Sequence, residues 1–139
     1  MTVVQKASLT PEVTAQLIEL SRLWMEENCS NGMVVNTAED LREPLYVALD
    51  GDRLVGISLG SIMHWCTGTE YYIYEFCISR DRQHEGLGTE LLRGIEERVK
   101  DMGVDHIFLQ TEESAPAYSF YQKNGFTELK GHVSLVHKL

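Results

Sequence analysis

A glycine-containing loop at positions 83–89, Gln-His-Glu-Gly-Leu-Gly-Thr, has the composition of a phosphate-binding site. Gly86 and Gly88 leave room for a tight turn and for close approach of a ligand to the backbone. The loop precedes an amphipathic segment, and the first amides of a helix lack partners within the helix and carry the positive end of its dipole. Turn geometry alone would also explain two glycines. The loop is therefore a candidate phosphate site that needs a second line of support.

Two common phosphate-binding motifs do not fit this loop. No Gly-Lys-Ser/Thr sequence ends it, which excludes a Walker A loop. A dinucleotide fingerprint needs a third glycine, where this chain has Leu91, and it lies early in a long parallel sheet, whereas only 51 residues follow Gly88. A different phosphate-bearing ligand is therefore expected.

Two segments together resemble signatures of the GNAT superfamily of N-acetyltransferases. Gln83–Gly88 is similar to the Q/R-x-x-G-x-G/A motif, and Ala117–Phe126 (AYSFYQKNGF) is similar to the A-x-x-F-Y-x-x-x-G-F segment. The resemblance spans about Leu45–Phe126. It departs from the family where Ser114 replaces a common Asn and where Gln83 replaces the commoner Arg. It implies direct transfer of the acetyl group of acetyl-CoA to a primary amine in a ternary complex.

The resemblance also implies where acetyl-CoA, the expected cofactor, would bind. Its pyrophosphate would lie on the backbone amides of the loop, and its pantetheine along the backbone of Phe76 and Ile78. Arg80 and Arg82 would offset the charge of Glu85. The expected cofactor-binding residues are Phe76, Cys77, Ile78, Gln83, His84, Glu85, Gly86, Leu87, Gly88, Thr89, Ser114, Tyr121 and Lys123. For Cys77, packing as a small buried side chain is an alternative, and for His84, simple surface exposure.

Two residues are predicted to be catalytic, Tyr121 and Glu75. In the family, the tyrosine at the Tyr121 position lies near the thioester sulfur, and an ordinary tyrosine pKa of about 10 keeps the phenol protonated at pH 7. Glu75 interrupts an otherwise apolar strand, where partial burial would raise its pKa toward the range of a useful base. The alternatives are a core position for Tyr121, and a salt bridge or an orienting role for Glu75.

The acceptor is expected to be a small cationic amine. The run Tyr72–Glu75 faintly resembles a strand of the small aminoglycoside 3-N-acetyltransferases. Polyamines, aminoglycosides, and protein N-termini or lysines all remain alternatives, as does a non-catalytic acyl-CoA-binding regulator. Acidic residues could line the entrance, and aromatic residues could add cation–π contacts. These candidates are Glu26, Glu27, Glu70, Glu112 and Glu113, together with Trp24, Trp65, Tyr71 and Tyr72.

A single α/β domain over residues 1–139 is expected to position these groups. It would have a GNAT-like, mixed and mostly antiparallel sheet of about six or seven strands, flanked by about four helices. Strands are predicted at residues 3–7, 45–49, 54–63, 70–79, 105–110 and 126–137. Helices are predicted at residues 10–28, 37–41, 86–102 and 115–123.

Charge and composition exclude several other functions. Acidic residues outnumber basic ones 21 to 12, so the formal net charge is −9. Nucleic-acid partners and anionic membrane surfaces need clustered Lys and Arg, and neither is expected here. The imbalance falls mainly in residues 1–70, with ten acids and four bases. A positively charged acceptor would agree with that distribution, although solvated surface acids would give the same count.

Cysteine, histidine and apolar patterns predict the remaining properties. Three cysteines form no CxxC pair and five histidines are scattered, which predicts reduced thiols and no metal site. No apolar run approaches the roughly 20 residues that span a bilayer, and no signal peptide is recognised, so a cytoplasmic protein is expected. An exposed closing strand at Gly131–Leu139 is expected to pair across the two-fold axis of a homodimer.

Overall fold

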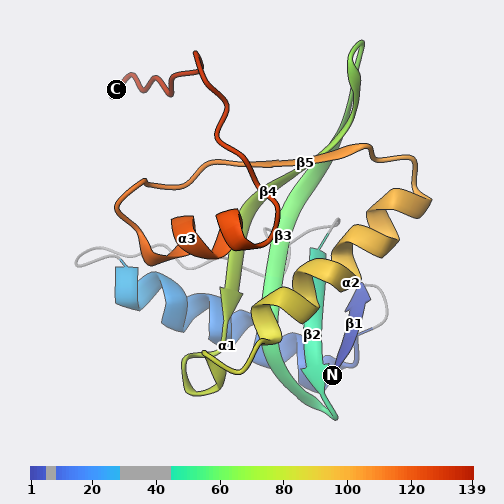
Figure 1. Ribbon diagram of the computed structural model, residues 1–139. Coiled ribbons are helices and arrows are strands. Elements are labelled where there is room, and N and C mark those ends of the chain that lie inside the picture. Colours follow the sequence, from blue (N-terminus) through green and yellow to red (C-terminus); the bar gives the residue numbers. More distant parts are fainter. Residues whose placement is uncertain (6–8, 29–44) are drawn as a thin grey trace.

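The computed structural model describes residues 1–5, 9–28 and 45–139, which form one five-stranded sheet with helices on both faces (Figure 1). The strands are β1 (Thr2–Gln5), β2 (Leu45–Asp50), β3 (Arg53–Trp65), β4 (Gly68–Ile78) and β5 (His106–Leu109). The helices are α1 (Pro11–Asn28), α2 (Leu87–Asp101) and α3 (Pro116–Lys123), with a short 3-10 helix, η2, at Arg80–Arg82. The strands lie side by side in chain order, and every pair is antiparallel except β4 with β5, which is parallel.

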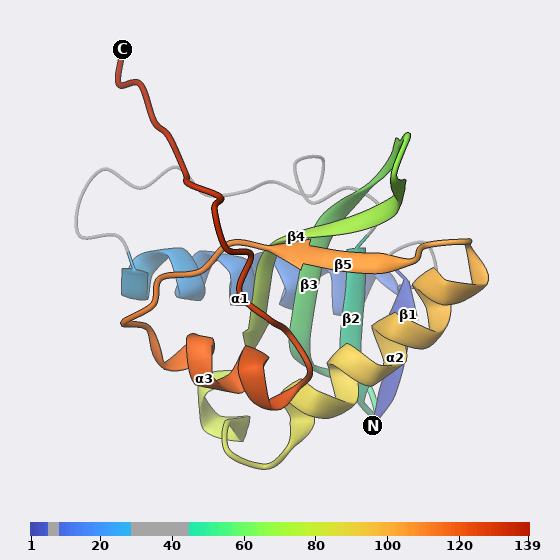
Figure 2. The ribbon, with the colours of Figure 1, turned by 45° about the horizontal axis from the view of Figure 1, so that its top comes forward.

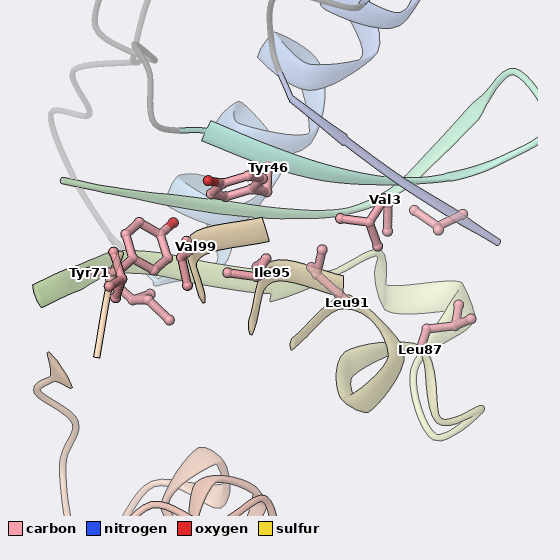
Figure 3. Close-up of a cluster of buried hydrophobic side chains, with 11 residues drawn as sticks. Val3, Tyr46, Tyr71, Leu87, Leu91, Ile95 and Val99 are labelled. Carbon is pink, nitrogen blue, oxygen red and sulfur yellow. The ribbon is translucent and has the colours of Figure 1, made fainter. Parts of the chain in front are cut away.

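Helix α2 covers one face of the sheet through a stripe of apolar side chains. Leu87, Leu91, Ile95 and Val99 recur at helical spacing, and all four are buried against β1–β4 (Figure 3). The helix is preceded by Gly86 and followed by a turn in which Gly103 has a φ of 86°. These four side chains therefore form the main core and fix the start of α2 beside the end of β4.

Helix α1 covers the opposite face. Val13 and Leu17 of α1 are buried with Ile57 of β3 and Cys77 of β4. The helix begins as its sequence predicts, because the Thr10 Oγ1 accepts a hydrogen bond from the Val13 amide at 3.2 Å. The two faces of the sheet are therefore distinct, and they are called the α1 face and the α2 face below.

The remaining predicted elements agree with the structure to within a few residues, except at the C-terminal end. Residues 126–137 were expected to close the sheet as a strand, and this expectation was wrong. The segment pairs with no strand in the described ranges and is mostly exposed. Five strands and three α-helices are described in place of about six or seven and about four. The predicted helix at 37–41 lies outside the described residues.

The last residues run away from the body of the protein. After α3 the chain crosses β5 and continues outward as an extended segment (Figures 1 and 2). We call Val133–Leu139 the C-terminal arm. The apolar side chains of the arm are mostly exposed, and the arm pairs with no strand among the described residues.

None of the helices in the described ranges is both long and apolar enough to cross a membrane.

Candidate active site

The sheet splits between β4 and β5. The parallel pairing of these strands joins only Glu70–Ile73 to His106–Leu109. Beyond this point β5 ends and the chain turns toward α3, while β4 continues to Ile78 (Figure 2). Residues Tyr74–Ile78 thus have no strand beside them on the β5 side within the described residues. An opening of this kind exposes main-chain groups to which an extended ligand can bind.

A β-bulge lies at the start of the split. In the β3–β4 ladder Gly60 pairs with Ile73 and Leu59 pairs with Glu75, so Tyr74 is the extra residue. A bulge bends its strand and changes the face to which the following side chains point. Ile73, before the bulge, packs on the α2 face, whereas Glu75 lies opposite Leu59, which packs on the α1 face. The bulge therefore directs Glu75 away from the main core.

Glu75 is a buried carboxylate with an unsatisfied oxygen. Its residue exposure is 8%, and its Oε1 accepts no hydrogen bond within the described part of the chain. Burial raises the pKa of this carboxyl above its ordinary value. This arrangement does not support the salt bridge considered from the sequence, because no ion pair to Glu75 is found among the described residues. A polar atom left unsatisfied in this way is costly unless it binds something in the working protein.

Tyr121 lies on α3, among aromatic rings. It is 9% exposed, and its ring centroid lies 6.2 Å from that of Phe76, 5.3 Å from that of Phe120 and 5.4 Å from that of Phe126. Burial, with a smaller contribution from nearby Cys77, raises the pKa of Tyr121 to about 12. Phe76 packs against the α2-face core, so Tyr121 approaches the split from that face while Glu75 is on the other. Tyr121 is therefore packed in an aromatic cluster that also lies beside the split.

The glycine-containing loop brings the first turn of α2 to the same end of β4. Gly86 occupies the N-cap position in the left-handed conformation, with φ 81°, and no side chain caps the helix. A Cβ at Gly86 would meet nothing within 4 Å, so space is open in front of these amides. A Cβ at Gly88 would lie 3.2 Å from the Phe120 ring, which makes this a point of close contact between α2 and α3. An uncapped first turn is suited to an anion.

Side chains around the loop hold it in place. The Gln83 amide donates to the Ile78 carbonyl oxygen at 3.2 Å. Arg82 pairs with Asp50 at 2.8 Å and with Glu85 at 3.1 Å, so its charge is engaged by two carboxylates, one of them Glu85. His84 is exposed and adopts a positive φ of 65°, which is uncommon for a side-chain-bearing residue.

The structure assembles some of the expected cofactor-binding residues and directs others elsewhere. Phe76 and Ile78 lie on the part of β4 beyond the split, Gln83 binds the Ile78 carbonyl oxygen, and Gly88 lies close to the Ile78 side chain. The Leu87 and Cys77 side chains are instead buried in the two cores, so only the backbone of either could meet a ligand at the split. Ser114 and Lys123 are exposed at either end of α3. Phe120, which the sequence analysis did not select, packs on Gly88 and Phe76; its place in the A-x-x-F-Y segment was the available signal.

A set of three aromatic side chains, of which Tyr74 is exposed and two are half-buried, lies next to Glu75 on β4 and β5. The Tyr72 ring centroid is 4.6 Å from that of Tyr74 and 5.1 Å from that of Phe108. Tyr74 is 60% exposed, and its hydroxyl lies 2.6 Å from the Ser61 Oγ. Tyr72 alternates with buried Tyr71 and Ile73, which places it on the α1 face. We call Tyr72, Tyr74 and Phe108 the aromatic ledge.

Several residues expected at an acidic and aromatic entrance are engaged in other ways. Tyr71 is fully buried in the α2-face core with its hydroxyl 3.1 Å from the Ser58 Oγ, so its placement at the entrance was wrong. Glu70 is bound by His106 at 3.2 Å and by the Trp65 indole at 3.4 Å. Asp105 and Glu70 raise the pKa of His106. Glu112 and Glu113 are exposed on the loop before α3, whereas the side chains of Trp24, Glu26 and Glu27 lie outside the described residues.

No group of three or more potential metal ligands comes together in the described ranges. The two described cysteines, Cys66 and Cys77, form no disulfide.

Comparison with known proteins gives matches in sequence and in structure. The family model described as "Acetyltransferase (GNAT) family" matches residues 13–126. The N-alpha-acetyltransferase 30 of Schizosaccharomyces pombe is 32% identical over 87 residues, which are 61% of this chain. That match covers 58% of the yeast protein, so the chain spans less than two thirds of its length.

Solved structures share the fold. An aminoglycoside acetyltransferase from an uncultured soil metagenomic sample, in complex with sisomicin, superposes with a TM-score of 0.78 at 18% identity, covering 99% of this chain and 94% of that one. A transcriptional regulator from Bacillus halodurans has a TM-score of 0.75 at 19% identity, with 99% of both chains covered.

Proposed function

The chain belongs to the acetyltransferase (GNAT) family, and we propose that it transfers the acetyl group of acetyl-CoA to the primary amine of a small cationic molecule. One observation carries this proposal. At the β4–β5 split, the buried carboxylate Glu75 with an unsatisfied oxygen and the buried, protonated phenol Tyr121 lie on opposite faces. A base on one side and an acid on the other is the arrangement that direct transfer requires.

The residues around the split fit acetyl-CoA. The open space before Gly86 and the uncapped first turn of α2 suit a pyrophosphate, and the pairing of Glu85 with Arg82 reduces repulsion of an anion. The unpaired side of Tyr74–Ile78 suits an amide-containing pantetheine chain. When bound, acetyl-CoA supplies the acetyl group as an activated thioester. The protein's own residues then have to bind it, orient the amine and move two protons.

Glu75 accepts a proton from the amine. An ammonium must lose a proton before its nitrogen becomes a nucleophile, and a carboxylate with a raised pKa is a better match for that task than an exposed one. The unsatisfied Oε1 is free to accept this proton directly or through a water molecule. The negative charge of Glu75 also attracts the cationic form of the acceptor into the site.

Tyr121 donates a hydrogen bond to the thiolate that leaves during acetyl transfer. Its pKa of about 12 keeps the hydroxyl protonated at neutral pH. A phenol stabilises a developing thiolate by donating this hydrogen bond, and it can pass on the proton when the thiolate needs it. The rings of Phe76, Phe120 and Phe126 fix its orientation and exclude water.

The aromatic ledge supports a cationic acceptor. Ammonium groups are attracted to the faces of tyrosine and phenylalanine rings, by about 0.5–2 kcal/mol. Tyr74 is exposed and adjacent in sequence to Glu75, with the bulge placing both on the α1 face. A cation resting on Tyr74 would therefore lie near the carboxylate that deprotonates it. The sisomicin complex of the metagenomic aminoglycoside acetyltransferase, a structural neighbour, agrees with such an acceptor.

Acetylation of protein N-termini is a second candidate. The yeast relative reported above is named an N-alpha-acetyltransferase. A peptide N-terminus would present a cation to the same ledge and carboxylate. Small amines and peptides therefore have to be compared directly.

Thiol release from acetyl-CoA, measured against a panel of amines, tests both candidates. Spermidine, sisomicin, glycine amide and short peptides with free N-termini are compared at equal concentration, and thermal shift with CoA, ATP and NAD checks the cofactor site. We expect stabilisation by CoA alone and turnover with a polyamine or aminoglycoside. A preference for peptides would favour the second candidate. Binding of CoA without turnover of any amine would favour a non-catalytic regulator, and stabilisation by ATP or NAD but not CoA would contradict the cofactor assignment.

A further inference from the structure

Gln110 is the first residue after β5, at the point where the main-chain pairing of β4 and β5 ends. The last paired positions are Ile73 and Leu109. Side chains alternate along an extended chain, so Gln110 follows Phe108 on the α1 face. It therefore lies at the start of the split, on the face to which the bulge directs Glu75.

The side-chain amide of Gln110 bonds to a different side chain through each of its two polar atoms. Its Oε1 accepts a hydrogen bond from the Tyr72 hydroxyl at 3.0 Å, and its Nε2 donates to the Ser134 Oγ at 2.7 Å. A side-chain amide can accept and donate in this way at the same time. The bond to Tyr72 joins β4 to the chain that follows β5, just beyond the last main-chain pair. It thus links the two strands where their main chains begin to separate.

Tyr72 is the ring that contacts both other rings of the aromatic ledge. Its plane makes an angle of 59° with that of Tyr74 and 28° with that of Phe108. The strand holds the Tyr72 side chain at its Cα end and Gln110 holds the hydroxyl at the other end, so the ring cannot swing away without breaking a hydrogen bond. The Tyr74 hydroxyl bonds instead to Ser61 of β3, in a part of the β3–β4 ladder where main-chain pairing continues on either side. Of these two tyrosine hydroxyls, that of Tyr72 is therefore the one bonded across the start of the split.

We infer that Gln110 is a positioning residue for the amine: by holding the Tyr72 hydroxyl, it keeps the aromatic ledge in the arrangement that receives a cation beside Glu75. This inference rests on the proposed function. A binding surface that is ordered before its ligand arrives loses less conformational entropy on binding, and the affinity for the ligand rises accordingly. Gln110 acts on the α1 face, whereas Tyr121 approaches the split from the α2 face. The affinity for the amine should therefore depend on Gln110, and the affinity for acetyl-CoA should not.

Steady-state kinetics of three variants test this role. Gln110 is exposed, so Gln110→Ala should fold normally; it should raise the KM for the most active amine about 3- to 10-fold and leave the KM for acetyl-CoA unchanged. Gln110→Glu keeps an oxygen that accepts from Tyr72 and should have an amine KM no higher than that of the wild type. Ser134→Ala removes the other partner of Gln110 and is the matched control, with both KM values unchanged. An equal rise in both KM values, an amine KM in Gln110→Glu as high as in Gln110→Ala, or the same loss in Ser134→Ala would overturn the inference.

Two further measurements test whether Gln110 acts through Tyr72. Tyr72→Phe keeps the ring and removes the hydroxyl, so it should raise the amine KM as Gln110→Ala does, and the double variant should be no worse than either single variant. Effects that multiply in the double variant would overturn the inference.

NMR spectra of protein labelled with ¹³C-tyrosine report on the Tyr72 ring without any amine or acetyl-CoA. The Tyr72 signals are those missing from Tyr72→Phe, and they should shift in Gln110→Ala and stay in place in Ser134→Ala. Unshifted Tyr72 signals in Gln110→Ala would overturn the inference. If no amine of the panel is acetylated by the wild type, the proposed function fails and the role of Gln110 fails with it. If Gln110→Ala acetylates the amine with an unchanged KM, the role of Gln110 alone fails.

Discussion

Replacement of Tyr121 by Phe removes a single hydroxyl from the proposed acid and leaves the aromatic cluster intact. The ring contacts with Phe76, Phe120 and Phe126 involve the ring and not the oxygen. Loss of the hydroxyl creates no sizeable cavity, so the variant should unfold at the temperature of the wild type. Activity is then the property that changes.

The expected loss of kcat in Tyr121→Phe follows from the Tyr121 pKa of about 12. A thiol resembling cysteine has a pKa of about 8.5, so complete proton transfer from Tyr121 to a free thiolate would be uphill by about 5 kcal/mol. The hydroxyl should therefore act chiefly by hydrogen bonding in the transition state. We expect kcat to fall about 10- to 1000-fold, or about 1.4–4 kcal/mol, with the dissociation constant of CoA changed little.

The pH profile separates this role from a structural one. With a pKa of about 12, the Tyr121 hydroxyl is ionised in roughly one molecule in 10⁴ at pH 8. The wild type and Tyr121→Phe should thus differ by a constant factor between pH 6 and about 10. Thiol release with the most active amine of the panel gives kcat, and calorimetry gives CoA affinity.

A matched control lies three residues earlier on the same helix. Tyr118 is partly exposed, and its hydroxyl accepts a hydrogen bond from Gln122 at 3.1 Å. Tyr118→Phe should retain nearly all activity. An unchanged kcat in Tyr121→Phe, an equal loss in Tyr118→Phe, or a ratio that varies with pH would refute the assignment of Tyr121 as the acid.

Three further substitutions test the rest of the site. Glu75→Gln should abolish the acidic limb of the pH–rate profile. Because burial raises the pKa of Glu75, its ionisation lowers the stability of the wild type as pH rises through that pKa, so the variant should have a higher melting temperature than the wild type at pH 8 and no higher one near pH 4. A lower melting temperature of the variant at pH 8 would contradict this. Tyr74→Ala should raise the KM for a cationic amine about 5- to 30-fold without changing the KM for acetyl-CoA. Tyr74→Phe keeps the aromatic ring and should leave both KM values unchanged. Equal effects of Tyr74→Ala on both KM values would contradict binding of the amine at the aromatic ledge. Gly60→Ala should destabilise the fold by about 1–3 kcal/mol in urea unfolding, because the added Cβ would collide with the Tyr72 carbonyl oxygen. An unchanged unfolding midpoint would contradict the close packing of β3 on β4.

Predictions from local sequence patterns were correct where the structure of a segment depends on residues within that segment. The stripe from Leu87 to Val99 and its flanking glycines predicted α2 to within a residue or two. Thr10 and Pro11 likewise predicted the start of α1. These features depend on helical periodicity and capping, which involve residues close together in the chain.

The prediction of a closing strand was wrong for a reason that does not apply to the helices. Its valine and leucine content does favour a strand, and residues 126–137 were assigned on that basis. Strand formation, however, also requires pairing with a neighbouring strand, and the arm pairs with none among the described residues. Composition therefore predicted a tendency to form a strand, and not the pairing that a strand also needs.

The sequence by itself determined the family resemblance, and it predicted a phosphate site at residues 83–89 and catalytic roles for Tyr121 and Glu75. The tertiary structure decided which face each of them occupies. Period-two alternation along β4 would have put Glu75 with Tyr71 and Ile73, in the main core. The bulge at Tyr74 shifts the alternation by one residue, so that Glu75 joins Tyr74 on the α1 face while Phe76 packs toward Tyr121. A bulge depends on how β4 pairs with β3, a long-range property that no local pattern in β4 encodes.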